Sequence, residues 1–217
     1  MYKSLTTAGI LLLGASGMTE AATVYTDRAI FEAAITVDLT EDFETLGTTT
    51  AGFSGPIVLP SGITAQSNSN ELFVVAPNQS TNPTTAIGSN FPITDSLDFL
   101  LGGLFGAFGV DLFQNDRGGT QTGAGWQFDI TLLNAGAIVG VFTSIVAPNG
   151  GSFFGVTSDS LFDSVSIFAA SPGLFEVADN VTLGNSVASV PLPAGLPLIL
   201  SALAGLGFVG RRRGRSA

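Results

Sequence analysis

Large apolar side chains recur at every second position through the middle of this 217-residue chain. Residues 104–113 alternate small and large side chains, and residues 126–132 place a large apolar side chain at each even position. A period of two is that of a β-strand, whose successive side chains point to opposite faces of a sheet. Both segments are therefore predicted to be strands with one face in a core. The pattern predicts an all-β protein.

Turn-forming residues separate these segments and others like them. Loops rich in Gly, Asn, Asp or Pro are expected at residues 114–119, 134–136, 148–151 and 171–173. Further strands are expected at residues 36–39, 40–44, 56–59, 63–66, 72–76, 96–101, 137–147, 151–158, 164–170 and 175–183. Strands with turns at roughly 8–12-residue spacing favour an antiparallel sandwich over a parallel α/β sheet. We predict an antiparallel β-sandwich of jelly-roll type.

Two stretches break the alternation. Residues 26–34 predict one short N-terminal helix, with Thr26 as its cap and Ile30 and Phe31 on one face. The segment 66–89 is rich in Ser, Asn, Thr and Pro and predicts an irregular polar loop.

The N-terminus has the three parts of a secretory signal peptide. Lys3 supplies a positive start, residues 8–13 an apolar stretch, and residues 19–21 a small-residue cleavage site. We predict that residues 1–21 are removed and that the mature chain starts near Ala22. The alternative is a buried N-terminal segment of the core.

The C-terminus combines a short motif, an apolar run and a basic tail. Residues 195–210 carry no charge and include Pro197, and a helix rising ~1.5 Å per residue would carry them across most of a ~30 Å hydrocarbon core. Basic residues beside such a span stay in the cytoplasm, so everything before Val190 is expected to be exported. The motif consists of Val190, Pro191, Leu192, Pro193 and Ala194. The residues expected to stop transfer are Arg211, Arg212, Arg213 and Arg215.

This order of motif, span and basic cluster resembles the PEP-CTERM class of bacterial sorting signals, in its Val-Pro-Leu-Pro-Ala variant. The resemblance covers residues 190–217. It implies recognition by an exosortase, a brief stay in the inner membrane, and a final place at the cell surface or in an extracellular matrix with exopolysaccharide. A plain C-terminal membrane tail is the alternative. The predicted organisation is therefore a β-sandwich domain over residues 22–184, a tether over 185–189 and the sorting signal.

Charge and composition exclude several classes of function. The exported body would carry 16 of the 17 acidic residues but only Arg28 and Arg117 as positive groups. Nucleic acid is excluded as a partner, since phosphate binding needs clustered Lys and Arg. The chain has no Cys and no His, so it lacks a thiol nucleophile, a Ser-His-Asp triad and the usual zinc ligands. A glycosidase needs only two carboxylates and stays open.

Four short stretches of the body are similar to the β-sandwich domains that precede PEP-CTERM signals, which have lectin-like or carbohydrate-binding-module-like architecture. These stretches are residues 42–44, 108–111, 153–159 and 179–181. The resemblance implies calcium as the candidate ion, shared by Asp42 or Glu44 with Asp179. Calcium takes oxygen ligands and would offset the acidic body. The alternative is that these are solvated charges, or that Glu44 pairs with Arg28 or Arg117.

A second group of candidate calcium ligands is Asp111, Asn115 and Asp116, which also fits a polar turn. Trp126, with Gln121 and Gln127 nearby, is the candidate carbohydrate-binding side chain, although its phase with Phe128 also fits core packing.

We therefore predict a secreted, non-enzymatic surface or matrix protein with a structural or adhesive role. A calcium-dependent carbohydrate-binding module and a carbohydrate-active enzyme are the alternatives.

Overall fold

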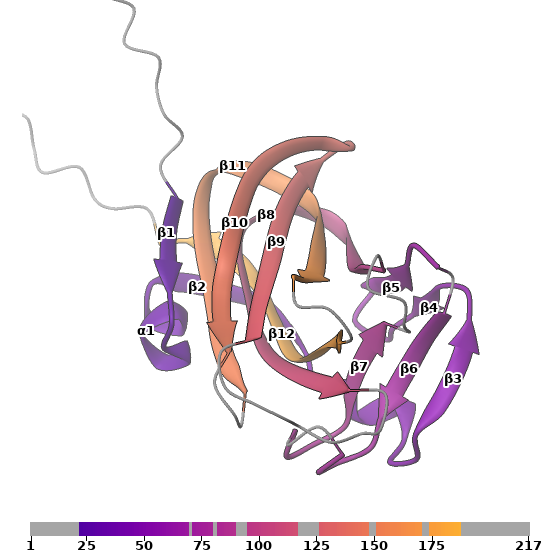
Figure 1. Cartoon of the computed structure of the whole chain (residues 1–217). Helices are drawn as coiled ribbons and strands as arrows, with labels where there is room; N and C mark the ends of the chain where they lie inside the picture. The colour runs from indigo at the N-terminus through magenta and orange to yellow at the C-terminus, as the bar shows by residue number, and fades with distance from the viewer. Residues whose placement is uncertain are drawn as a thin grey trace, which may run out of the picture. The chain divides into compact units, whose positions relative to one another are not determined.

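The structure, a computed structural model, describes residues 22–69, 71–79, 82–89, 95–116, 126–147, 151–170 and 174–187. All strand pairs among them are antiparallel, and they join in one 12-stranded sheet (Figure 1). The prediction of an all-β, antiparallel protein is confirmed. The jelly-roll assignment stays a prediction.

The elements follow one another in the order shown by the labels of Figure 1. The helices are α1 (Arg28–Ala33) and the 3-10 turn η1 (Glu44–Leu46). The strands are β1 (Ala22–Tyr25), β2 (Ile35–Glu41), β3 (Ala51–Ser54), β4 (Ile57–Val58), β5 (Thr64–Ser67), β6 (Glu71–Val75), β7 (Ala86–Ser89), β8 (Leu97–Asp116), β9 (Trp126–Asn134), β10 (Ala137–Ala147), β11 (Ser152–Ala169) and β12 (Leu174–Ser186).

Two long strands, β8 and β11, run through both halves of the sheet, one half with β5 and β9 and the other with β12. The first part of β8 pairs with β5 and with the end of β11, whereas its second part pairs with β12 and with the start of β11. Gly102, with φ +71°, lies between the two parts, where the register with β11 also shifts. A positive φ favours glycine, so this residue type suits the bend. The two halves of the sheet share one apolar core.

Phenylalanine fills much of that core. Phe99 and Phe108, from the two parts of β8, have ring centroids 6.5 Å apart, and Phe142 of β10 lies 5.6 Å from Phe154 of β11. In β9, the alternating Phe128, Ile130 and Leu132 are fully buried, as the period of two predicts.

The short N-terminal helix is confirmed, but its cap is not Thr26. Asp27 caps it, because its Oδ1 accepts a hydrogen bond of 3.0 Å from the backbone N–H of Ile30. Phe31 is fully buried against Ile35 and Ala107, and Tyr25 and Phe153 pack on the same cluster.

Several predicted boundaries are wrong. The segment 66–89, predicted as an irregular polar loop, contains two strands. β6 confirms the strand predicted at residues 72–76, whereas β7 was not predicted, and Leu72, Val74 and Ile87 give the two strands a buried face. β8 continues to Asp116 through the start of the predicted turn, because its end pairs with β12. β12 runs to Ser186, two residues into the predicted tether, because it pairs there with β2.

Among the described residues, no helix is long and apolar enough to cross a membrane. The predicted signal peptide (1–21), the motif (190–194), the span (195–210) and the basic tail (211–215) all lie outside the described residues. Their assignments stay predictions.

Candidate functional site

One face of the sheet lies open to solvent over β9, β11, β8 and β5. In register across these strands, the side chains on the other face are Leu132, Val165, Phe99 and Ala65, and all four are fully buried in the core. Because successive side chains point to opposite faces, the residues between them face outward. The open face is thus fixed by the packing beneath it.

Two rows of side chains cross this open face. The first row runs through Leu133, Ser164, Leu100 and Thr64, and the second through Thr131, Ser166, Asp98 and Gln66. All of them are half-buried except Leu100, which is 41% exposed. The second row is entirely polar and spans four strands.

Two hollows on this face are lined by described residues. The larger measures about 720 Å³ and is lined by Leu100, Gly102, Gly103, Leu104, Asn134, Gly136, Asp163 and Ser164. The smaller measures about 250 Å³ and is lined by Gln66, Asp98, Leu100, Leu133, Ser164, Val165 and Ser166. Since Leu100 and Ser164 line both hollows, we treat the two together and name them the groove.

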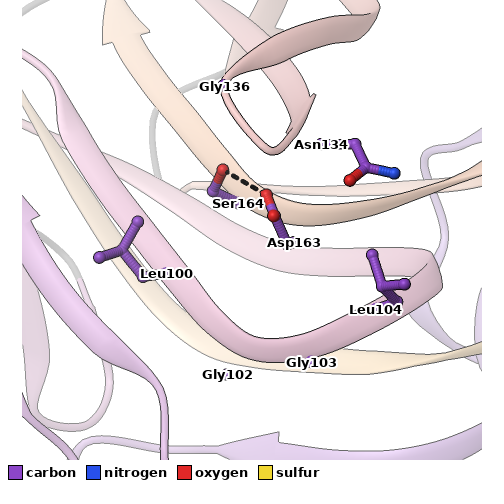
Figure 2. A pocket seen from close by; sticks show the side chains of 8 residues that line it. All are labelled: Leu100, Gly102, Gly103, Leu104, Asn134, Gly136, Asp163 and Ser164. Atoms are coloured by element: carbon purple, nitrogen blue, oxygen red, sulfur yellow. Dashed lines mark hydrogen bonds between the residues drawn. The ribbon is translucent and has the colours of Figure 1, made fainter.

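Hydrogen bonds fix the polar groups of the larger hollow (Figure 2). The Asp163 carboxylate accepts from the Ser164 hydroxyl at 3.0 Å, which is the bond drawn in Figure 2. It also accepts from the backbone N–H of Ala135 at 2.9 Å. Asn134 donates from Nδ2 to the carbonyl of Leu161 at 3.0 Å. Leu104, which is 53% exposed, provides an apolar surface at the end of the hollow. These groups are therefore held in place before any ligand binds.

Asp98 of the smaller hollow is different. Its Oδ1 atom is buried from solvent and has no hydrogen-bond partner among the described residues. A buried acceptor without a donor destabilises a protein by about 1–3 kcal/mol. Of the acidic side chains that line the groove, Asp98 is thus the one with an unsatisfied oxygen.

The candidate calcium ligands Asp42 and Glu44 do not lie on one strand. β2 ends at Glu41, and Phe43 is fully buried with φ +57°, which turns the chain into η1. Asp42 is exposed and accepts from the backbone N–H of Glu44 at 3.1 Å. Glu44 instead accepts from the backbone N–H of Thr85 at 2.7 Å. The two carboxylates are bound to different parts of the chain.

Asp179, the third candidate, is fully buried in β12. It accepts from the Thr84 hydroxyl at 2.6 Å and from the backbone N–H of Asn180 at 2.7 Å. Burial raises its pKa to about 6, and the nearby Asp111 and Glu44 carboxylates add to that rise. Across the described residues, no three Asp or Glu side chains form a group suited to a metal ion. Sharing of a calcium ion between Asp42 or Glu44 and Asp179 stays a prediction.

Asp111, from the second candidate group, binds Arg28. Arg28 Nη2 lies 3.0 Å from Asp111 Oδ2, and the guanidinium stacks over the ring of Phe153 at 4.6 Å. Glu44 therefore does not pair with Arg28. The side chains of Asn115 and Asp116 lie outside what the structure describes, as do those of Arg117 and Gln121.

Trp126 begins β9, and its backbone pairs with Ala147 of β10. Its side chain lies outside what the structure describes, so its role in carbohydrate binding stays a prediction.

Glu176 is a buried carboxylate that sequence reasoning missed. It is 2% exposed and accepts from the Ser89 hydroxyl and the backbone N–H of Ala169. Burial raises its pKa to about 7, against the lowering effect of those hydrogen bonds. No motif marks it, since the two groups that bind it come from β7 and from the end of β11.

No protein-family model and no curated protein matches the chain. Among solved structures, it is similar to a mutant of CBM29-2, a family 29 carbohydrate-binding module, with 13% identity and a TM-score of 0.37 over 67% of this chain and 98% of that one. It is also similar to a family 89 glycoside hydrolase from Clostridium perfringens, with 12% identity and a TM-score of 0.35 over 61% of this chain and 15% of that one. Both scores lie below the range in which two chains are taken to share a fold.

Proposed function

We propose that this chain is a secreted, non-enzymatic protein of the cell surface or extracellular matrix, placed there by an exosortase. The observation that carries the proposal is the order of motif, apolar run and basic tail over residues 190–217. A signal peptide exports the body, the apolar run halts it in the inner membrane, and cleavage near Val190–Ala194 removes the tail. Such a chain acts through its location, as a structural or adhesive component.

The sorting step is tested with two variants in an exosortase-producing host. Pro191→Ala with Pro193→Ala alters the motif, whereas Ala188→Ser with Ser189→Ala alters only the residues before it. We expect the motif variant to stay in the inner-membrane fraction and the control to reach the surface or medium. Equal export of both variants would sink the sorting proposal.

A second candidate function, carbohydrate binding, is favoured by the groove. Sugars present hydroxyls that donate and accept hydrogen bonds, and the groove offers hydroxyl, amide and carboxylate groups beside the exposed Leu100 and Leu104. The groove is open along the sheet, which suits a polymer. The test is a glycan array probed with the exported protein, on which the absence of any bound glycan counts against this function.

A further inference from the structure

We infer that the groove binds a neutral polysaccharide and rejects an acidic one, with the Asp98 carboxylate as the central acceptor of its hydroxyl groups. This inference rests on the carbohydrate-binding function proposed above and names the class of glycan.

Asp98 presents an unsatisfied acceptor in the smaller hollow of the groove. Its Oδ1 is buried without a partner among the described residues, and an ionised carboxylate only accepts hydrogen bonds. Because Asp98 also lines the smaller hollow, its carboxylate offers a ligand there an acceptor and no donor. A sugar hydroxyl can donate to it, and hydrogen bonds to a charged acceptor are roughly twice as strong as neutral ones.

The neighbours of Asp98 in the polar row can both donate and accept hydrogen bonds. Ser166 and Gln66 flank it in the same row, on β11 and β5, and both side chains donate as well as accept. A hydroxyl that donates to Asp98 therefore finds donors beside it for its own lone pairs. A row in which an acceptor lies between two side chains that can donate matches a ligand whose polar groups are all hydroxyls.

The charge of the side chains that line the groove is negative. None of the described residues that line the groove is Lys or Arg, whereas Asp98 and Asp163 both line it. The body contains only two arginines, and Arg28 is bound to Asp111. A uronic acid or a sulfated sugar would thus bring a negative charge beside two carboxylates, and no described residue that lines the groove supplies a cation to offset it. We therefore expect the groove to bind polysaccharides that carry uronic acids or sulfate groups poorly.

The length of the polar row exceeds that of one sugar unit. The polar row crosses four strands, and strands lie about 4.8 Å apart, so the row extends over about 14 Å. A single sugar covers only part of this distance. We expect the affinity to rise from a monosaccharide to a short oligosaccharide and then to level off.

The experiment uses the exported protein and affinity electrophoresis in gels that contain one polysaccharide each. The neutral set is β-glucan, mannan, xylan and galactan, the acidic set is alginate and polygalacturonate, and chitosan is the cationic amino-sugar polymer. We expect retardation by at least one neutral polymer and by neither acidic one. Calorimetry with oligomers of the neutral ligand then measures the length dependence.

Asp98→Asn and Asp98→Leu test the acceptor. Asp98→Asn keeps the size and removes the charge, and we expect about tenfold weaker binding, whereas Asp98→Leu abolishes it. Asp159→Asn is the matched control, because Asp159 is an exposed residue of β11 that does not line the groove. It is expected to bind within about twofold of the parent. Thermal unfolding confirms that each variant is folded.

The outcomes separate the inference from the function beneath it. Binding of an acidic polymer as tightly as a neutral one, or neutral binding that both Asp98 variants leave unchanged, overturns the inference while carbohydrate binding stands. Preference for a cationic amino-sugar polymer overturns it as well, since a charge would then replace the hydroxyl donor. The absence of binding to every polymer overturns the proposed carbohydrate function itself.

Discussion

Phe31 fits beneath α1 only because two residues on the strands below it are glycines. A Cβ atom on Gly109 of β8 would lie 2.6 Å from Cε1 of Phe31, and one on Gly155 of β11 would lie 2.8 Å from its Cδ2. Such distances are too short for carbon atoms in contact. The ring of Phe31 therefore occupies the space that side chains at Gly109 and Gly155 would fill.

We predict that Gly109→Ala destabilises the protein by about 1–3 kcal/mol, because the added methyl group overpacks the Phe31 cluster. Gly103→Ala is the control, since a Cβ there meets Phe105 at an ordinary 3.5 Å. The free energy of unfolding in urea measures both variants. Equal free energies of unfolding for the two variants would show that the side chains around Phe31 can shift to admit the methyl group without loss of stability. If the cluster is the cause, adding Phe31→Leu should recover part of the loss.

Glu176 makes stability depend on pH. Its pKa of about 7 in the folded protein lies above its ordinary value of 4.5, because burial disfavours the charged form. Between those two pH values the folded state binds more protons than the unfolded state. The contribution of Glu176 to stability is therefore fully present below about pH 4.5 and is lost as the pH rises to about 7. The buried Asp179, with its pKa raised to about 6, acts in the same direction.

We predict that Glu176→Gln removes much of this pH dependence. The amide oxygen can still accept from Ala169, and the amide nitrogen can donate to Ser89, so the packing is kept. Parent and variant should be about equally stable at pH 4.5, and the variant should be more stable at pH 8, by on the order of 3 kcal/mol. Urea unfolding at both pH values measures the difference. A variant that is less stable than the parent at pH 8 would refute this explanation.

At the scale of the element, α1 illustrates how tertiary contacts make a short helix possible. Six residues are too few for a stable isolated helix. Arg28 holds its first turn to the sheet by donating to Thr182 Oγ1 and to the carbonyl of Asn180, both at 2.9 Å, besides its ion pair with Asp111.

We predict that Arg28→Ala lowers the free energy of unfolding by about 2–4 kcal/mol. The substitution removes the guanidinium that now donates to both the Asp111 carboxylate and the Asn180 carbonyl. Glu32→Ala is the control. Its contact with Arg28, 3.4 Å long, is exposed and is expected to contribute less than about 1 kcal/mol. Thermal unfolding at one pH compares the two. Similar melting temperatures for both variants would mean that Arg28 does not anchor the helix.

The sequence predicted strands well where one face is buried, and poorly where the chain changes direction. β9 matches its period of two because Phe128, Ile130 and Leu132 all enter the core. The strand predicted at residues 40–44 extends past the end of β2 at Glu41. Phe43 is large, apolar and buried, as in a strand, but its backbone adopts a left-handed turn conformation.

The groove could be predicted only in part. A polar residue between two buried ones, as at Asp98 between Leu97 and Phe99, signals an outward-facing position. Its alignment with Ser166 and Gln66 depends on strand register, which a single sequence does not fix. Glu176 was missed for the same reason, since β7 and the end of β11 meet it only in the folded chain.

At the scale of the whole molecule, the distribution of charge separates the body from the two ends. Lys3 is the single lysine, and four of the six arginines lie at residues 211–215. Loss of both ends would leave an acidic body whose one primary amine is its new N-terminus. Such a body would repel acidic polymers as a whole, in agreement with the charge of the groove.

The central claim is that both ends are removed as the protein is exported and sorted. Intact-mass and terminal-peptide mass spectrometry of the native protein, recovered from the cell surface or medium, measures this directly. We predict an N-terminus near Ala22 and a C-terminus within or close to residues 190–194. A protein that retains Arg211–Arg215 would contradict exosortase processing and leave a simple membrane tail in its place.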